Sequence, residues 1–451
     1  MSGTNMNRYT VDVKPRNSLS SMPKLATFKD QEAPSWLGGR VTIYAPMVMR
    51  DPKEPHRVSS ALEKLFDLTL VVALSAVSTQ FATNIQYGGD MSTSFTMFLI
   101  SFFTIWNTWF PYVWFATTYD VDDVLYRVGT FGEMVGILMI SDGIAHNITE
   151  VVVGYIVLRF FHAVFFRLRA AYEDPARRAV NLKHSILSTL VMVCWYFQQS
   201  FSSTYVSQVG GFAVLACCDL AYPYVAQRST APAGRTKYHA HHVSDRYSEF
   251  TTMVFGESIL SLSHATVLKS ATAFNGEAIS TCIASMVLLF VLWWIYVLVP
   301  FGQILHDNPT LTYVVAYGHF FIHAPLAAFA SGIYIMGLAT QAGDSSHGSS
   351  HGRRLDGDDT LAISVDTAAY VISMSITMLF VSIPLILSLP HKILLRNALA
   401  SVVLNVIAAT APGHVTVSTL MWLFCLPVVA VLGIVLMTYR KTVPGLGSPS
   451  T

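Results

Sequence analysis

The sequence predicts an all-α integral membrane protein with about twelve transmembrane helices, and three observations favour this class. Charged residues make up only 12% of the 451 residues, about half of what a soluble surface requires. Hydrophobic residues make up 53%, and the mean hydropathy is +0.48. The apolar residues gather in runs of about 20, the length that an α-helix needs to cross the hydrocarbon core of a bilayer.

Twelve apolar runs follow one another along the chain, six before and six after a polar stretch. The third run is the most polar because it contains Arg127 and Glu133, and the eleventh run is short. We expect each run to form one membrane-spanning helix. The runs are 62–83, 93–117, 123–141, 148–168, 183–203, 209–227, 243–264, 277–302, 311–338, 362–388, 393–411 and 415–438.

Positive charges between the runs predict the orientation of the chain. Lys and Arg residues concentrate in the N-terminal tail, in the fourth-to-fifth, sixth-to-seventh and tenth-to-eleventh connections, and at the C-terminus. Because cytoplasmic loops carry the excess of Lys and Arg, we expect both ends of the chain to be cytoplasmic. The pattern does not indicate which cellular membrane holds the protein. The charges that follow the tail are Arg167, Arg169, Arg177, Arg178, Lys183, Arg228, Arg235, Lys237, Lys392, Arg396, Arg440 and Lys441.

The first and seventh runs resemble each other and indicate an internal repeat. Glu63 and Asp67 open the first run, and Asp245 and Glu249 open the seventh with the same spacing. Two halves of six helices would share one orientation, which predicts parallel repeats about an axis along the membrane normal. A chance likeness between two amphipathic helix starts is the alternative.

Five regions follow from this division of the chain. Both tails are polar, and we expect the N-terminal tail to be mostly disordered and cytoplasmic. A short cytoplasmic linker joins the two halves. The regions are 1–57 (N-terminal tail), 58–227 (first six-helix half), 228–242 (linker), 243–439 (second half) and 440–451 (cytoplasmic C-terminal tail).

The seventh run carries one polar stripe. His242, Arg246, Glu249, Met253 and Glu257 lie at helical spacing and fall within about 80° of one another at 3.6 residues per turn. Charged side chains inside a membrane are costly and persist when they are paired or line a path. The stripe is therefore predicted to face the interior of the helix bundle.

Glu257 is the strongest single candidate on this stripe. It lies 15 residues after His242, which is about 22 Å along the helix axis and well inside the hydrocarbon core. A proton- or cation-coupling carboxyl would suit this depth. A carboxyl that only clamps two helices by hydrogen bonding is the alternative, and the neighbouring Gly256 also suits close helix packing.

Charged residues in the first half complete the set of candidates. Glu63 and Asp67, one turn apart, are expected to share a cation, to pair with Arg127, or to bind Arg159. Arg159 lies mid-span and needs an acidic partner, for which Asp67 and Glu257 are candidates. The predicted transport or coupling residues are therefore Glu257, Glu249, Asp67, Glu63, Arg159, Arg246, His242 and Arg127.

Other site classes have weak support. The net charge of +1 gives no basic field for nucleic acid, and no cofactor motif is present. Histidines at 239, 241 and 242 and at 347 and 351 invite a zinc site, but their spacing matches no closed structural site. We expect His347 and His351, like His239 and His241, to belong to polar loops.

Several short motifs resemble those of the low temperature requirement A (LtrA) family over residues 58–340. The resemblance implies a multi-pass membrane fold and says little about activity. The family commonly has Glu-Arg where this chain has Asp245-Arg246, and an acid where Val297 follows Tyr296. The motifs are Glu63-x-x-Phe66-Asp67-Leu68, Tyr119-Asp120-x-Asp122-Asp123-x-x-Tyr126-Arg127, His242-x-x-Asp245-Arg246, Gly256-Glu257-Ser258, Trp293-Trp294-x-Tyr296 and His319.

Three functions remain open at this point. Repeat architecture and acids at depth favour a transporter or channel for a small solute or ion. A structural or sensory membrane protein would use the same charges only to hold helices together. An intramembrane metal-dependent enzyme would use the acids with His242 and His319, but neither His-Glu-x-x-His nor Gly-x-Ser-x-Gly occurs. The solute, the coupling ion and the oligomeric state stay open.

Overall fold

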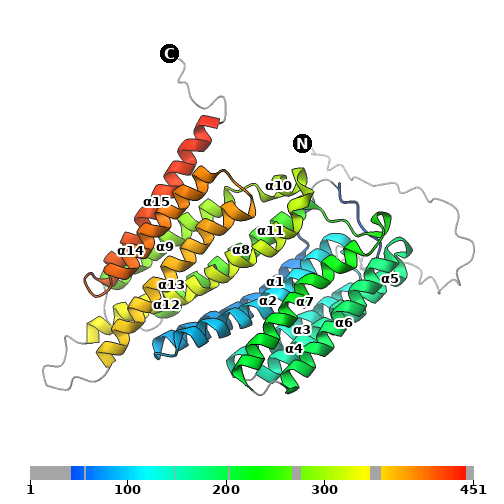
Figure 1. Ribbon diagram of the computed structural model, residues 1–451, viewed down its shortest axis with the longest axis horizontal. Helices are drawn as coiled ribbons and strands as arrows, with labels where there is room; N and C mark the ends of the chain where they lie inside the picture. Colours follow the sequence, from blue (N-terminus) through cyan, green and yellow to red (C-terminus); the bar gives the residue numbers. More distant parts are fainter. Residues whose placement is uncertain are drawn as a thin grey trace, which may run out of the picture. The chain divides into compact units, whose positions relative to one another are not determined.

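The computed structural model describes residues 42–54, 57–146, 148–201, 204–266, 276–345 and 357–442, and these are almost entirely helical (Figure 1). Each of the twelve predicted runs falls on a helix, and three of the helical segments are interrupted. The helices are α1 (Ala61–Gln86), α2 (Met91–Tyr119), α3 (Val124–His146), α4 (Ile148–Arg159), η2 (Phe160–Phe166), α5 (Arg167–Glu173), η3 (Pro175–Arg177), α6 (Arg178–Phe201), α7 (Tyr205–Arg228), η4 (Pro232–Gly234), α8 (Ala240–Thr266), α9 (Gly276–Val297), α10 (Phe301–Asp307), η5 (Pro309–Leu311), α11 (Thr312–Gly318), α12 (Phe320–Ser345), α13 (Gly357–Ile386), α14 (His391–Thr410) and α15 (Val417–Thr442).

Nine helical segments within the described residues are long and apolar enough to cross a membrane. This confirms an all-α polytopic membrane protein. The other three long helices, α2, α6 and α8, are more polar. Helix α8 carries the polar stripe, while α2 is rich in Trp, Thr and Ser and is buried along most of its second half.

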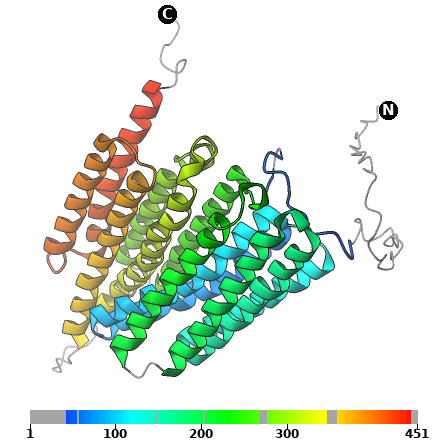
Figure 2. The same cartoon turned by 45° about the vertical axis from the view of Figure 1, so that its right-hand side comes forward.

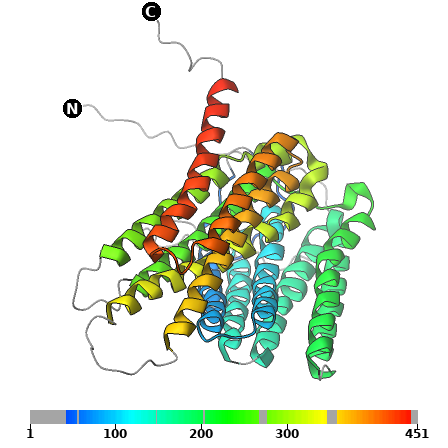
Figure 3. The ribbon, with the colours of Figure 1, turned by 60° about the vertical axis from the view of Figure 1, so that its left-hand side comes forward.

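The two central helices, α1 and α8, contact each other and also pack on α12. Helix α1 additionally packs on α2 and α3, and α8 on α9 and α10. In Figure 2, α3, α4, α6 and α7 follow one another as neighbouring helices. The orange and red helices that Figure 3 brings forward are α13, α14 and α15, with α9 against α15.

Helix α1 begins with a capping box that also fixes a candidate residue. The Ser60 hydroxyl accepts a hydrogen bond from the Glu63 backbone N–H at 3.2 Å, and the Glu63 Oε2 accepts one from the Ser60 N–H at 2.8 Å. Two of the unpaired donors at the helix start are satisfied in this way. One carboxylate oxygen of Glu63 is thus held at the cap, and the other is left for a partner.

Helices α3 and α4 approach each other closely at glycines. A Cβ atom on Gly136 would lie 2.8 Å from the Gly154 carbonyl oxygen, and one on Gly154 would lie 2.7 Å from that of Gly136. Small residues are what allow membrane helices to make backbone contact. Beyond this contact the chain forms the π-helix η2 directly after Arg159, a local change of pitch that is often found at functional sites.

The end of the predicted N-terminal tail is packed, which corrects the expectation of disorder for that part. The Ala45 N–H donates to Asp123 at 2.9 Å, and the Met47 N–H donates to Glu173 at 2.6 Å. Met47 itself is fully buried. The prediction overlooked these contacts because the acids that hold this segment lie 78 and 126 residues further along the chain. Residues 1–41 of the predicted tail lie outside the described residues.

Candidate functional site

Helices α1 and α8 meet in a parallel register at their N-terminal ends. Glu63 faces His242, and Asp67 faces Arg246, and both pairs are 179 residues apart. A constant difference between partners requires the two helices to run in the same direction. The polar stripe of α8 is thus turned toward α1 and into the bundle, and the helical spacing predicted this inward face but not the partner helix.

Arg246 is the centre of this cluster. Its two terminal nitrogens each donate to one oxygen of Asp67, both at 2.6 Å, and the arginine is fully buried. The same guanidinium contacts Glu249 at 3.1 Å and Glu63 at 3.9 Å. The planar fork of arginine matches a carboxylate in this two-bond geometry. The Trp109 indole N–H also donates to Asp67, at 3.1 Å, and fixes the carboxylate from α2.

Two further residues extend the cluster along the helices. The His242 Nε2 lies 3.3 Å from the Glu63 Oε1, and both side chains are buried. Glu249 is half-buried, with 34% of its side chain exposed, and accepts a hydrogen bond from the Ser59 hydroxyl at 2.7 Å. The cluster is therefore closed at Glu63 and His242 and open to the surroundings at Glu249.

The cluster carries an excess of negative charge. Glu63, Asp67 and Glu249 supply three carboxylates, whereas Arg246 supplies one permanent positive charge. With His242 protonated the sum is −1, and with His242 neutral it is −2. An isolated charge of this kind is costly to bury, so the arrangement can accept a proton or a small cation.

A second charged group lies beside this cluster and is balanced by itself. Arg50 pairs with Glu54 at 2.6 Å and approaches Asp120 at 4.0 Å, while buried Arg57 donates to a backbone carbonyl at 2.8 Å. Burial raises the pKa of Asp120 and lowers that of Arg57. The charges of these two positive and two negative residues cancel, so the excess of negative charge in the cluster around Arg246 remains.

Glu257 lies deeper on the same stripe and apart from the charged residues. It is buried, and Ser261 donates to its Oε1 at 3.3 Å, while Ser75 of α1 lies beside the same carboxyl. Its Oε2 has no hydrogen-bond partner among the described residues. Eight residues separate Glu257 from Glu249, which is about 12 Å along the helix. A Cβ on Gly256 would meet open space, so this glycine does not serve close packing.

The family model described as bacterial low temperature requirement A protein (LtrA) matches residues 58–437, nearly the whole chain. The chain belongs to the LtrA family. No curated protein matches it, and no solved structure does. The resemblance expected for residues 58–340 therefore extends almost to the end of the last helix. Within this LtrA protein, motif residues from the first and seventh runs meet in the cluster around Arg246.

Two residues that were predicted to join the cluster around Arg246 lie elsewhere. Arg159 does not pair with Asp67 or Glu257: its carboxylate partner is Asp219 of α7, at 2.9 Å, and both are buried. Arg127 does not join Glu63 or Asp67 either. It is about half exposed and pairs with Asp122 at 2.9 Å. The expectations failed because helix neighbours, and not depth alone, decide which charges meet.

Asp219 is the charged residue that sequence reasoning missed. It receives hydrogen bonds from Tyr155 at 2.7 Å, Trp195 at 2.9 Å and Asn107 at 3.0 Å in addition to Arg159. Both carboxylate oxygens of Asp219 thus accept hydrogen bonds, and the ion pair with Arg159 is neutral as a unit. The sequence did contain a sign of this role, because Asp219 is the single acid in the apolar run 209–227.

A second overlooked pair joins α3 to η2. The His162 Nδ1 lies 3.2 Å from the Glu133 Oε1, and both residues are buried. The second oxygen of Glu133 and the second nitrogen of His162 have no hydrogen-bond partner among the described residues. This pair is a further protonatable site in the first half, separate from the cluster around Arg246.

The histidines form no metal site in the described part of the chain. Among the described residues, no three His, Cys, Asp or Glu side chains lie together so that they could coordinate a metal ion. His239 is buried against the Glu54 carbonyl at 2.8 Å, which corrects its expected place in a solvated loop. His319 packs against Tyr247, and its Nε2 lies 3.3 Å from the Tyr296 hydroxyl. His347 and His351 lie outside the described residues.

Proposed function

We propose that this LtrA protein is a transporter or channel for a small solute or ion, with the α1–α8 cluster as its proton or cation site. The observation that carries the proposal is the excess of negative charge in a cluster that is buried at Asp67 and Arg246 and open at Glu249, where Glu63, Asp67 and Glu249 outnumber Arg246 and His242. A purely structural ion pair needs one acid for each base. Additional buried acids are typical of ion and proton pathways in membranes.

The helix arrangement supports a repeat of two halves. In each half the first helix packs on the third, the third on the fourth, the fourth on the fifth and the fifth on the sixth. These contacts are α1–α3, α3–α4, α4–α6 and α6–α7, and correspondingly α8–α12, α12–α13, α13–α14 and α14–α15. The cluster therefore joins the first helices of the two proposed repeats, where relative movement of the halves would act on it.

The stripe on α8 supplies a route from the edge of the cluster inward. Glu249 is accessible, Arg246 and Asp67 lie next to it, and Glu257 follows about 12 Å deeper. A proton or cation that entered at Glu249 would meet Glu257 as the next carboxyl on this face. Glu257 is thus the residue whose neutralisation tests the route.

Proton uptake by liposomes tests the proposal. Purified protein is placed in liposomes that enclose a pH-sensitive dye, and a potassium gradient with valinomycin sets the interior negative. We expect dye acidification above protein-free liposomes, and loss of that signal in Glu257→Gln. The matched control is Glu277→Gln. Glu277 lies at the start of α9, off the stripe, and accepts hydrogen bonds from Ser418 of α15.

The same potassium diffusion potential, with sodium outside the liposomes and a sodium-sensitive dye inside them, separates the two coupling ions. Full flux in Glu257→Gln, with normal protein level, would contradict the role of this residue. Wild-type flux that equals the protein-free background in both the proton and the sodium measurement would contradict the ion site itself.

A structural role is the second candidate, and the two short bonds between Arg246 and Asp67 favour it. The exchange Asp67→Arg with Arg246→Asp distinguishes the two functions. If the charges only hold helices together, the exchanged protein should regain both stability and every activity of the wild type. If they form an ion site, stability should return while ion flux stays lost, because the carboxylate has moved to α8.

A further inference from the structure

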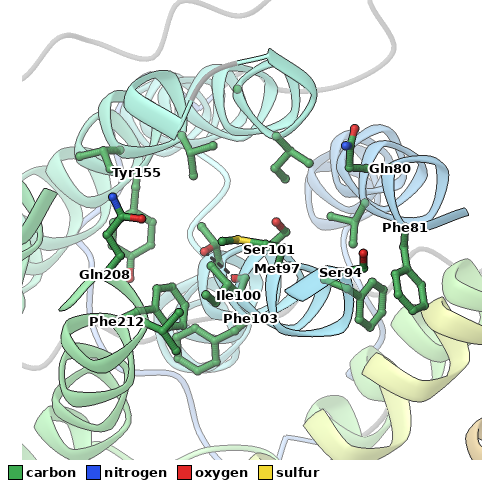
Figure 4. A pocket seen from close by; sticks show the side chains of 18 of the residues that line it. Gln80, Phe81, Ser94, Met97, Ile100, Ser101, Phe103, Tyr155, Gln208 and Phe212 are labelled. Atoms are coloured by element: carbon green, nitrogen blue, oxygen red, sulfur yellow. Dashed lines mark hydrogen bonds between the residues drawn. The ribbon is translucent and has the colours of Figure 1, made fainter. Parts of the chain in front are cut away.

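We infer that the first half of the chain contains a binding site for a neutral, mostly apolar small molecule with one polar end. The site is a cavity of about 450 Å³ between α1, α2, α3, α4, α6 and α7, within the size range of ligand pockets. Figure 4 looks into it: Gln80 and Phe81 form one wall, and Phe212 stands on the opposite side. This inference does not depend on the proposed transport.

The body of the cavity is aromatic. Phe212 makes edge contacts with Phe103 at 5.6 Å and with Trp195 at 5.0 Å between ring centroids, and Trp195 makes one with Tyr155 at 5.9 Å. The polar atoms of Trp195 and Tyr155 are both engaged by Asp219, at 2.9 and 2.7 Å. These rings therefore present apolar surface to the cavity, which suits a hydrocarbon or aromatic body.

The lining carries no acidic residue, lysine or arginine among the described residues. The one lining histidine, His146, lies 3.4 Å from Asp142, which offsets its charge when it is protonated. The Arg159–Asp219 ion pair behind Tyr155 is neutral as a unit, and the Asp219 carboxylate also accepts hydrogen bonds from Tyr155, Trp195 and Asn107. An ion that entered would lose its hydration without gaining an opposite charge, which is strongly unfavourable. The chemistry of the cavity thus selects neutral molecules, in contrast to the cluster around Arg246.

Polar groups gather at one end of the cavity. Asn84 lies near the end of α1, Gln198 near the end of α6 and Gln208 in the first turn of α7, and the Gln198 amide donates to the Gln208 carbonyl at 3.1 Å. This end is opposite to the N-terminal ends of α1 and α8. A hydroxyl or amide on the ligand would find hydrogen-bonding groups there while its apolar body reached the aromatic wall.

Photolabelling with a neutral probe tests the site. The protein in nanodiscs is exposed to an eight-carbon alcohol that carries a diazirine, irradiated, digested and mapped by mass spectrometry. We expect label on lining residues such as Met97, Tyr155 and Phe212, and loss of this label when unlabelled octanol is in excess. A nanodisc lipid with a diazirine in its acyl chain distinguishes the source: label on the same residues would identify a lipid chain as the apolar occupant.

Two serines of α2 give a matched pair of variants. Ser101 lines the cavity and Ser92 is exposed on the same helix. Ser101→Trp should fill the cavity and abolish the label, whereas Ser92→Trp should leave it unchanged. Octanol competition in the wild type keeps the test valid if Ser101→Trp fails to fold.

Two results would overturn the inference. One is label spread evenly over lipid-facing side chains and unaffected by octanol. The other is equal labelling of the lining by the same chain with a trimethylammonium group in place of the hydroxyl, which would show that the cavity does not select against charge.

Discussion

Replacing Arg246 by methionine removes the positive charge at the centre of the cluster while keeping a side chain of similar length. Asp67 and Glu63 then remain buried without their shared cation. Three hydrogen bonds to carboxylates disappear, two of 2.6 Å and one of 3.1 Å. Each is worth about 1.5–3 kcal/mol. Their sum is an upper limit, since Asp67 keeps its bond from Trp109 and can take up a proton.

Breaking one partner of a buried ion pair costs about 3–5 kcal/mol, and we expect Arg246→Met to lower the free energy of unfolding by this amount. The assay is equilibrium unfolding in mixed micelles of a mild detergent and dodecyl sulfate. Arg127→Met is the control, because its pair with Asp122 is exposed and surface pairs contribute about 0–1 kcal/mol.

The double variant Asp67→Asn with Arg246→Met sharpens this test. Removing both charges should restore part of the lost stability, since the largest part of the cost is the carboxylate left alone. A loss below about 1 kcal/mol in Arg246→Met, or a double variant less stable by the full sum of the two single effects, would refute the pairing described here.

Three further predictions use the same unfolding assay. Asp219→Asn should cost about 3–5 kcal/mol because Arg159 loses its carboxylate in a buried network, and a cost near zero would contradict that network. Gly136→Ala should cost about 1–3 kcal/mol of stability through overpacking against the α4 backbone. Gly256 has open space around it, so Gly256→Ala should be neutral or stabilise by up to about 1 kcal/mol. Similar losses in both variants would be inconsistent with the close contact. Burial raises the pKa of Asp123, but hydrogen bonds from an arginine of α5 and from backbone N–H groups outweigh it and hold the pKa below its ordinary value. The stability that this carboxylate contributes is therefore present above the unfolded pKa of about 3.9 and is lost as the pH falls through the lower folded pKa. The difference in free energy of unfolding between wild type and Asp123→Asn should therefore vanish in that acidic range. A difference that grows there would contradict the role of these hydrogen bonds.

Helix positions were predictable because the bilayer imposes one length on every spanning segment. Each of the twelve apolar runs falls on a helix, and the spacing of the stripe on α8 correctly gave its inward face. Length and composition together mark nine helical segments of the described residues as candidate spans. Helix α8 is not among them because of its polar stripe, whose His242 and Arg246 side chains are buried against α1.

Partners were less predictable than positions. The sequence indicated that Arg246 and Asp67 are both buried, but any acid at a similar depth was an equally good partner for any arginine. Arg159 was therefore assigned to Asp67 or Glu257, while Asp219 was overlooked in its apolar run. Pairing depends on which helices are neighbours, and that is set by packing over the whole bundle, including the glycine contact between α3 and α4.

Helix α1 is the element that the two proposed sites share. Its first two turns carry Glu63 and Asp67, and its last turns place Phe81 and Asn84 in the wall of the cavity. The 14 residues from Asp67 to Phe81 span about 21 Å, and a helix of this length transmits a shift at one end to the other because its backbone bonds are continuous. A change in the Asp67–Arg246 contact that moves α1 relative to α2 would also alter the cavity wall. Coupling between binding sites is reciprocal, so a ligand that holds the wall of the cavity in place would bias the affinity of the cluster for its proton or cation. One helix thus links the charged cluster near its N-terminal end to the neutral cavity near its C-terminal end, and this link is what our two proposals together predict to be coupled.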